Sequence, residues 1–357
     1  MASNGQIQEI LKRGILAPSA DNLQPWLFQI QGDVVDFHID KDRAKYFCDE
    51  GLLIPYLSAG AVLQNIRVSA SQLGISLSIT HFPNSSDAYW FARVRFSAGR
   101  SQLHPHFEAL SSRETNRRFY QAGGAIRESS LNKIADAIQY DSGFKLAWLR
   151  RTDDQFGELS KIIGDADQIR FEAQRLHHDL MEVMRFSEKE SIENKDGLDI
   201  KSLEAGPCGS VMFRMMKSWE TTRLLNGIGL SRSFNYYARA QMRSSQAAGV
   251  ILAPDWSRES FVRGGEAMQK IWHEATLEGL AMQPMEALPI FMVSLNQTGG
   301  KDFTAGQKKK LQILKEKFYS LFGIQDKNGI ILFFRVGIAK KPSARSKRRP
   351  LESFIVS

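Results

Sequence analysis

Cysteine is scarce in this chain, whose 357 residues include only Cys48 and Cys208. Cysteines placed this far apart have neither the spacing of a metal-binding cluster nor that of a Cys-x-x-Cys redox pair. A reducing compartment suits such free thiols. We therefore expect a cytoplasmic protein without a cysteine-based metal or redox centre.

Long apolar runs and targeting signals are also missing. No apolar stretch approaches the roughly 18 residues that a membrane-spanning helix requires. The first residues, Met-Ala-Ser-Asn-Gly-Gln, lack the basic and apolar regions of a secretory signal. We expect a soluble protein without a membrane partner.

The length of the chain exceeds that of a usual single core and leaves room for two domain-sized halves.

The histidines show no arrangement typical of a metal site. His104 and His106 flank a proline, while His177, His178 and Asp179 are adjacent on a predicted helix. Neighbouring helical residues point about 100° apart, so they cannot ligate one ion together without distortion. We expect no metal.

The chain is basic, with a formal net charge of +8. Such a charge can indicate a nucleic-acid partner, but much of the excess lies near the carboxyl end, in residues 340–349. That cluster is either a free basic tail or part of a binding site. We expect no nucleic-acid partner.

Residues 113–119, Arg-Glu-Thr-Asn-Arg-Arg-Phe, contain a candidate phosphate grip. In an extended backbone Arg113, Thr115 and Arg117 would point to the same side. Guanidinium groups bind phosphate oxygens by charge-assisted hydrogen bonds, and the threonine hydroxyl completes the set. Phe119 is expected to anchor the segment in the core. Taken alone, the same residues would favour a solvated surface turn.

The segment 17–26, Ala-Pro-Ser-Ala-Asp-Asn-Leu-Gln-Pro-Trp, follows an amphipathic helix predicted over residues 6–16. Pro18 stiffens the loop, and Ser19 and Asn22 offer hydrogen-bonding groups to a ligand. Asn22 could instead cap a turn. The neighbouring Asp21 would repel an anionic ligand unless it faced solvent or paired with a cation.

An internal repeat connects the two halves of the chain. Residues 60–75 align without a gap with residues 265–280, matching Gly60 with Gly265 and Gln64 with Gln269. A strand that closes in a similar pattern follows each of these helices, at residues 91–96 and at residues 333–338. Amphipathic helices that end in glycine are common, so chance is the alternative to duplication.

The remaining pattern predicts an α+β protein. We expect strands at 26–30 and 34–39, a helix at 58–73, a helix from about residue 102, a helix at 131–138 and a strand at 144–149. A long helical tract, about 152–245, has no counterpart in the first half. It either enlarges the core or acts as a lid. The predicted domains are residues 1–100 and residues 101–357, the second carrying this tract as an insertion.

Together the two motifs resemble the nitroreductase family of flavin enzymes, in which a phosphate clamp precedes the loop within one subunit. Here the phosphate grip, which corresponds to this clamp, follows the loop. This inverted order resembles the tandem-fused, Acg-like branch of the family. In that family the clamp of one subunit and the loop of the other hold each flavin. The resemblance implies a nitroreductase-like fold in which two duplicated halves form an intramolecular pseudo-dimer. Oligomeric state stays open, a monomer included.

The resemblance also implies a set of flavin mononucleotide (FMN) contacts. A third family element corresponds to residues 283–288, where the backbone N–H of Ala287 would point to flavin N5. A further cation would come from the basic cluster, with Arg348 as first choice and Arg345 or Lys347 as substitutes. The complete expected FMN-binding set is Arg113, Thr115, Arg117, Pro18, Ser19, Asn22, Pro284, Met285, Glu286, Ala287, Arg345, Lys347 and Arg348.

By the same resemblance the chain is expected to be an oxidoreductase without a catalytic side chain. Hydride would pass from NADH or NADPH to flavin N5, and then to a small acceptor such as a nitroaromatic or a quinone, with ping-pong kinetics. Such an enzyme needs no Gly-x-Gly-x-x-Gly motif, and none is present. The alternative is an FMN-sequestering or regulatory protein whose lid covers the ring and permits little turnover.

The motifs complete only one site. A second, symmetry-related site would need a clamp before residue 6 and a Pro-Ser-x-x-Asn loop near residue 140, and neither occurs. We therefore predict one FMN per chain. The ratio of flavin absorbance to protein concentration measures this number, and a value near two would contradict the prediction.

Overall fold

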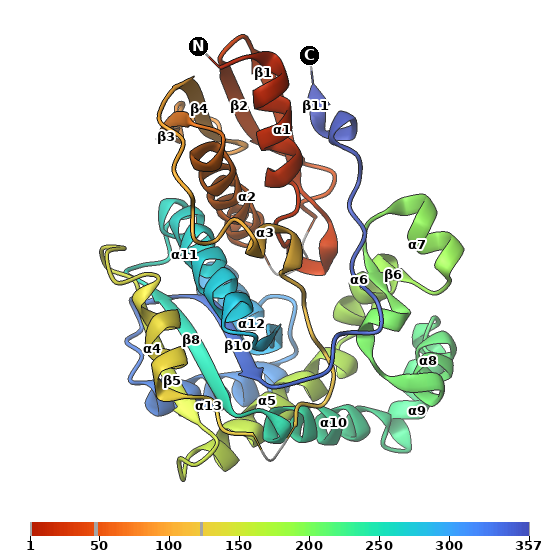
Figure 1. The fold of residues 1–357 in the computed structure, drawn as a ribbon. Coiled ribbons are helices and arrows are strands. Elements are labelled where there is room, and N and C mark those ends of the chain that lie inside the picture. The colour runs from red at the N-terminus through yellow and green to blue at the C-terminus, as the bar shows by residue number, and fades with distance from the viewer. Residues whose placement is uncertain (1, 46–48, 122–123, 357) are drawn as a thin grey trace.

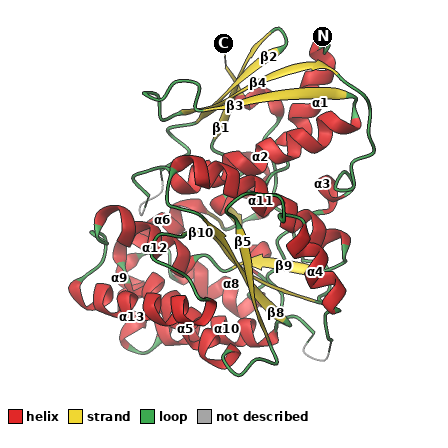
Figure 2. Ribbon diagram, turned by 90° about the vertical axis from the view of Figure 1, so that its left-hand side faces the viewer, coloured by secondary structure: helices red, strands yellow, loops and turns green. Residues whose placement is uncertain are grey.

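The computed structural model describes residues 2–45, 49–121 and 124–356 (Figure 1). Two sheets lie at opposite ends of the molecule, and the helices α2 (Leu53–Gln72) and α11 (Arg258–Leu277) lie between them (Figure 2). This mixture of mainly antiparallel sheets and separate helices confirms the α+β class. None of the helices in the described ranges combines the length and the apolarity needed to cross a bilayer.

The described part of the first half contains seven elements before the clamp. They are α1 (Asn4–Gly14), η1 (Ala20–Asn22), β1 (Trp26–Gln31), β2 (Val34–Ile39), α2 (Leu53–Gln72), β3 (Ile75–His81) and β4 (Trp90–Ala98). A five-stranded sheet has the order β11-β1-β2-β4-β3, and its edge strand β11 (Ile355–Val356) comes from the carboxyl end of the chain. Because β11 pairs in parallel with β1, the end of the chain returns to the first half.

The second half is built around a four-stranded antiparallel sheet of order β5-β8-β10-β9. The strands are β5 (Lys145–Arg150), β8 (Ala247–Ala253), β10 (Gly329–Gly337) and β9 (Ala281–Pro284). Every residue of β8 and β10 is buried, as expected for strands covered on both faces. The second half also contains the helices α3 (Ala109–Ser112), α4 (Glu128–Asp136), α11 (Arg258–Leu277), α12 (Ala287–Thr298) and α13 (Ala305–Phe322).

The predicted helical tract contains six α-helices, one short 3-10 helix (η2) and a small two-stranded sheet. They are α5 (Phe156–Glu172), α6 (Gln174–Val183), β6 (Met184–Arg185), α7 (Glu188–Asn194), β7 (Leu198–Asp199), η2 (Ile200–Leu203), α8 (Gly206–Met215), α9 (Trp219–Gly227) and α10 (Leu230–Ser244). Residues of α5 share a core with β8, α12 and α13, whereas residues between 171 and 230 form a smaller core of their own. The proposed domain division stays a prediction.

The aligned helices of the internal repeat cross at their matched glycines. A Cβ atom added to Gly60 would lie 1.8 Å from the carbonyl oxygen of Val262, and one added to Gly265 would lie 2.0 Å from that of Leu57. The same added atoms would each lie 2.9 Å from the Cα of the other glycine. The equivalent positions of the two repeats therefore pack on each other, as a pseudo-twofold relation between the halves requires.

Several sequence expectations need adjustment at element boundaries. Helix α2 begins at Leu53, five residues before the expected start at 58, and β4 and β10 extend beyond the strands expected there. The helix expected from about residue 102 is wrong, because only the four-residue α3 forms, at Ala109–Ser112. Cys48 lies outside the described residues, and Cys208 is exposed.

We predict that Gly60→Ala and Gly265→Ala each destabilise the protein by about 2–3 kcal/mol, because the added methyl groups meet backbone atoms that cannot give way. Denaturant unfolding followed by circular dichroism measures the loss. Gly157→Ala is the matched control, since an added Cβ at this helical glycine has no neighbour within 4 Å. The control should leave stability unchanged or raise it by up to about 1 kcal/mol. Equal stability of all three variants would contradict the close crossing.

Candidate functional site

Two adjoining cavities lie where the halves meet. The arginine cavity, of about 300 Å³, is lined mainly by three segments. They contribute Arg113, Glu114, Thr115 and Arg117 from the clamp, Pro18, Ser19, Asp21 and Asn22 from the loop, and Ala344, Arg345, Ser346 and Arg348 from the carboxyl-terminal segment. The inner cavity, of about 290 Å³, is lined by residues 283–291, by part of α5 and by α2. Six residues line both cavities: Pro18, Ser19, Asp21, Thr115, Arg117 and Leu198. The two cavities together therefore form one elongated site.

The clamp segment is extended because it pairs with β9. Thr115 forms a parallel β-bridge with Met282, and the Asn116 N–H donates to the Met282 carbonyl oxygen at 3.0 Å. Arg113, Thr115 and Arg117 all line the arginine cavity, as the alternation predicts. The side chain of Asn116 points elsewhere and donates to the Lys340 carbonyl oxygen at 2.8 Å.

Arg113 carries a buried and poorly neutralised charge. Its side chain lies over the Trp272 ring, 4.6 Å from the ring centre, and the residue is only 7 % exposed. Its Nε and Nη1 atoms have no hydrogen-bond partner. Burial, together with the charges of Arg348 and Arg345, lowers the pKa of Arg113 to about 9. Such a group is stabilised by an anion in the cavity.

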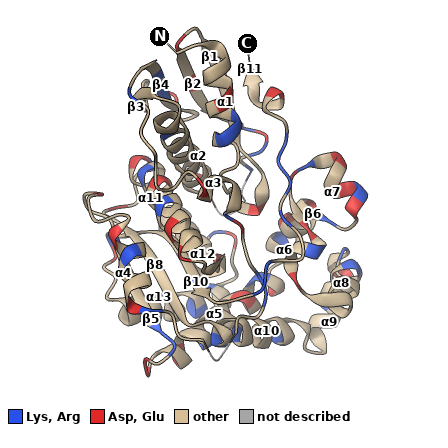
Figure 3. Ribbon diagram, viewed as in Figure 1, with Lys and Arg blue, Asp and Glu red and all other residues tan. Residues whose placement is uncertain are grey.

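The carboxyl-terminal segment supplies two more cations to this cavity and runs past α6 to β11 (Figure 3). Arg348 donates to the Ala17 carbonyl oxygen at 3.0 Å and to Asn22 Oδ1 at 2.7 Å. Burial, and secondarily Arg345, lowers the pKa of Arg348 to about 10. Arg345 also pairs with Glu114 at 3.2 Å. Lys347 lines neither cavity, and its carbonyl oxygen accepts from Asn22 Nδ2 at 3.1 Å.

The loop from the first half is held in a strained conformation. Asp21, Asn22 and Gln24 have φ values of 47°, 57° and 54°, in the left-handed region that few non-glycine residues adopt. Ser19 Oγ accepts from the Gln24 N–H at 2.9 Å, and the Asn22 amide is engaged with the carboxyl-terminal segment. Both Ser19 and Asn22 line the arginine cavity. Asp21 lies within electrostatic reach of Arg117. Of the two arrangements expected for this carboxylate, the structure therefore shows the one with a nearby cation.

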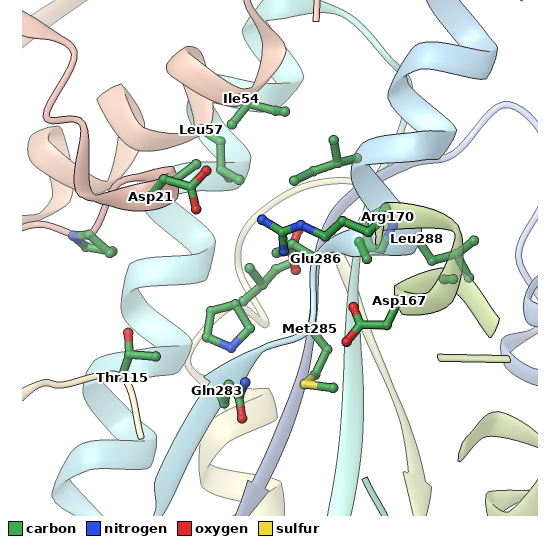
Figure 4. Close-up of a pocket in the computed structure, with 18 of the residues that line it drawn as sticks. Asp21, Ile54, Leu57, Thr115, Asp167, Arg170, Gln283, Met285, Glu286 and Leu288 are labelled. Carbon is green, nitrogen blue, oxygen red and sulfur yellow. The ribbon is translucent and has the colours of Figure 1, made fainter. Parts of the chain in front are cut away.

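Residues 283–288 form the floor of the inner cavity (Figure 4). Gln283 accepts from Arg335 Nε at 2.7 Å, and the Met285 N–H donates to the Phe333 carbonyl oxygen at 2.9 Å. Ala287 is the first residue of α12, and N–H groups in the first turn of a helix have no partner within that helix. Ala287 is not among the residues with positive φ, so its methyl group causes no strain.

Glu286 is a buried acid in the inner cavity. Its Oε1 accepts from the Phe333 N–H at 2.9 Å. Burial raises the pKa of Glu286 to about 8, and the hydrogen bond from Phe333 opposes this shift only partly. The side chain is therefore mostly neutral at pH 7.

Sequence reasoning missed three charged residues of the site. Arg335 is fully buried and donates to Gln283, to the Gln241 carbonyl oxygen and to the Arg118 carbonyl oxygen, thereby joining the clamp to β9. A single arginine within the apolar strand Ile330–Gly337 was a visible signal for it. Asp167 and Arg170 of α5 line the inner cavity, and no motif marks them.

The expected role of Phe119 is wrong. Phe119 is 50 % exposed and contacts the Tyr237 ring edge to face. The buried anchor is the next residue, Tyr120, whose hydroxyl donates to the Asn116 carbonyl oxygen at 2.9 Å and whose ring lies against Arg335. The ring of Tyr120 packs on the Arg335 guanidinium while its hydroxyl bonds to the Asn116 carbonyl oxygen, so the tyrosine takes the inner position.

The described part of the chain holds no group of three or more His, Cys, Asp or Glu side chains able to bind a metal ion. His177 is buried and bonds to Thr222 and to the Met216 carbonyl oxygen. His106 pairs with Glu274 at 3.1 Å. Both histidines thus have structural partners.

No family model matches the chain. It is 25% identical over 289 residues to a Mycobacterium tuberculosis protein named "Putative NAD(P)H nitroreductase acg", covering 79% of this chain and 80% of that protein. The name of this relative agrees with the nitroreductase resemblance of the two motifs. An uncharacterized protein of the same species is 23% identical over 341 residues, which cover 95% of this chain. The chain spans about half, 47%, of the length of that second relative.

Solved structures align with this chain at lower sequence identity. NfnB from Mycobacterium smegmatis in complex with NADPH, an FMN-dependent nitroreductase, aligns with a TM-score of 0.38 and 13% identity, over 71% of this chain and 97% of that one. A nitroreductase-like family protein from Bacillus cereus aligns with a TM-score of 0.36 and 10% identity, over 71% of this chain and 96% of that one.

The raised pKa of Glu286 predicts a pH-dependent loss of stability. The folded state holds this proton up to about pH 8, whereas the unfolded carboxyl releases it near its ordinary pKa of 4.5. The stabilisation is therefore complete below pH 4.5 and is lost as pH rises through 8. The slope is at most about 1.4 kcal/mol per pH unit. Unfolding free energies at pH 5 and pH 8 should differ less in Glu286→Gln than in the wild type.

The exposed Glu182→Gln is the control for this comparison and should keep the wild-type pH dependence. An unchanged slope in Glu286→Gln would show that this carboxyl does not hold a proton in the folded protein.

Proposed function

We propose that the chain is an FMN-dependent oxidoreductase that uses NADH or NADPH to reduce small acceptors such as nitroaromatics and quinones. The observation that carries the proposal is the convergence of Arg113, Arg345 and Arg348 on one cavity, with two buried N–H-bearing atoms of Arg113 left without partners. Three guanidinium groups fit the phosphate of FMN, which carries close to two negative charges. The relative named as an NAD(P)H nitroreductase supports the same activity.

The shape of the site fits the rest of this cofactor. The arginine cavity continues into the inner cavity through Ser19, Thr115 and Arg117, so a ligand held by its phosphate can extend toward residues 283–288. We assign the phosphate to Arg113, Thr115, Arg117 and Arg348, with Arg345 closing the cavity. The flavin ring would lie against Pro284, Met285 and Glu286, with the Ala287 N–H directed toward N5.

When bound, FMN would supply hydride acceptance and donation at N5 of its ring. The chain's own residues would bind and orient the reactants. N–H groups at the start of α12 stabilise negative charge that develops nearby, because the helix dipole adds to their hydrogen bonds. The inner cavity excludes water by its apolar lining, which includes Ile54, Leu57 and Leu288. We expect donor and acceptor to use this one cavity in turn, which produces ping-pong kinetics.

The first test removes the phosphate grip. We predict that Arg113→Ala/Arg117→Ala weakens FMN binding by about 3 kcal/mol or more, at least ~100-fold in Kd, since each charge-assisted hydrogen bond contributes about 1.5–3 kcal/mol. Flavin fluorescence after titration of the flavin-free protein measures this Kd. Arg118→Ala is the matched control because the Arg118 side chain bonds to Lys341 and Ser343 rather than lining either cavity. Equal FMN affinity of the two variants would refute the assigned grip.

A second candidate function, FMN sequestration, is favoured by contacts that tie the helical tract over the site. Lys195 O accepts from Gln24 Nε2 at 2.9 Å, and Ser202 O accepts from Arg117 Nη1 at 3.3 Å. Asp196 pairs with Arg349, and Glu204 Oε2 accepts from Ser343 Oγ at 2.9 Å. The tract therefore contacts the loop, the clamp and the carboxyl-terminal segment at once. A lid held this firmly would slow access to the ring.

Anaerobic mixing with NADH or NADPH distinguishes the two functions. A reductase should lose its flavin absorbance near 450 nm rapidly in the wild type. A sequestering protein should bleach slowly, and bleaching should accelerate in Asp196→Asn/Glu204→Gln, which loosens the tract. Glu193→Gln, an exposed position on α7, serves as control and should leave either rate unchanged. Rapid wild-type bleaching with no effect of the loosening variant would exclude the closed lid.

A further inference from the structure

One wall of the inner cavity carries a charged pair that the proposed flavin contacts do not use. Asp167 and Arg170 are three residues apart on α5, so they lie on the same face of this helix. Figure 4 shows both side chains directed into the cavity from α5, across from Thr115 and Asp21. Neither residue lines the arginine cavity. The pair thus belongs to the ring end of the site only.

Within the described ranges, the side chains of Asp167 and Arg170, both in α5, form neither a hydrogen bond nor an ion pair. The charge of Arg170 acts on Asp167 only at longer range. Burial raises the pKa of Asp167 to about 6, and Arg170 opposes this shift. Both residues are half-buried and line the cavity, so a ligand with complementary hydrogen-bonding groups would be preferred over an apolar one.

The charge balance of the cavity selects the kind of ligand. The other charged or titratable groups that line it are Asp21, Arg117 and Glu286. Asp21 offsets Arg117, and Glu286 is mostly neutral at pH 7. The Asp167–Arg170 pair also sums to zero, because one carboxylate accompanies one guanidinium. An anion attracted by Arg170 would be repelled by Asp167, so the pair favours a neutral group that both donates and accepts hydrogen bonds.

A primary carboxamide has this pattern, since its N–H donates to a carboxylate and its carbonyl oxygen accepts from a guanidinium. We propose that Asp167 and Arg170 bind the carboxamide of the reduced nicotinamide and so determine how the hydride donor is oriented over the ring. Asp167 accepts from the amide N–H, and Arg170 donates to the amide oxygen. This inference rests on the proposed function and assigns donor recognition to residues of the helical tract.

The flavin ring also has an amide-like edge, but the pair lies opposite the elements assigned to FMN. Thr115 and Asp21 are on the far side of the cavity, and Gln283, Met285 and Glu286 lie between the two walls (Figure 4). A flavin held by the clamp and lying on residues 283–288 leaves α5 facing the second reactant. Donor recognition is therefore the assignment that the geometry favours.

The experiment compares nicotinamide with 3-acetylpyridine, which keeps the carbonyl oxygen but lacks the amide N–H. Binding of each to the oxidised flavoprotein is measured by perturbation of the flavin absorbance, and bleaching is then measured with NADH and with its 3-acetylpyridine analogue. We expect the wild type to bind nicotinamide about 10-fold more tightly, as the loss of one hydrogen bond to a charged group predicts.

Two variants assign the contacts. Asp167→Ala should abolish the preference by weakening nicotinamide alone, whereas Arg170→Met should weaken both pyridines about 10-fold or more. Gln168→Ala is the control and should keep the wild-type preference, because the Gln168 side chain bonds to Glu172 and Asn235 and lines neither cavity. FMN affinity should be unchanged in all three variants.

The outcomes separate failure of this inference from failure of the proposed function. A yellow protein that binds both pyridines equally, or whose preference survives Asp167→Ala, overturns the inference alone. Weaker FMN binding in Asp167→Ala or Arg170→Met, with the preference intact, also overturns it by assigning the pair to the flavin. A protein that retains no FMN, or that neither NADH nor NADPH bleaches, contradicts the proposed function as well.

Discussion

Close contact between α2 and α11 sets the distance between the two halves, and both cavities depend on it. At Gly60 and Gly265 the helices approach so closely that even a methyl group would meet backbone atoms. The same helices provide Ile54, Leu57 and Trp272 to the cavity walls. A wider crossing would separate the loop of residues 17–26 from the clamp of residues 113–117. The site is therefore a consequence of how two similar helices pack.

Buried positive charge is the second feature that shapes this protein. Arg113 and Arg348 lie in one cavity with lowered pKa values because burial and neighbouring guanidinium groups disfavour their charged forms. Arg335, also buried, is satisfied by five oxygen acceptors and by the ring of Tyr120. The contrast separates structural from binding arginines. Arg335 has partners within the chain, whereas Arg113 retains donors for a ligand.

Patterns within short segments of the sequence predicted most of the strands, turns and side-chain directions that depend on neighbouring residues. The alternation of residues 26–30 and 34–39 marks β1 and β2, and the turn between them lies where Gly32 takes a φ of 64°. The alternation of the clamp also predicted its three cavity-lining residues. Expectations failed where burial is decided by distant partners. Tyr120 rather than Phe119 is buried because Arg335, more than two hundred residues away in sequence, occupies the adjacent space.

The sequence by itself determined the α+β class, the repeat, the two motifs and the basic cluster, because each depends on residues close together in the chain. Only the tertiary structure decided that Asn22 and Arg348 bond to each other, that β11 joins the first sheet, and that Asp167 and Arg170 face the inner cavity. These features arise from contacts between segments far apart in sequence. Hydrophobic periodicity records which face of an element is buried, but not which element covers it.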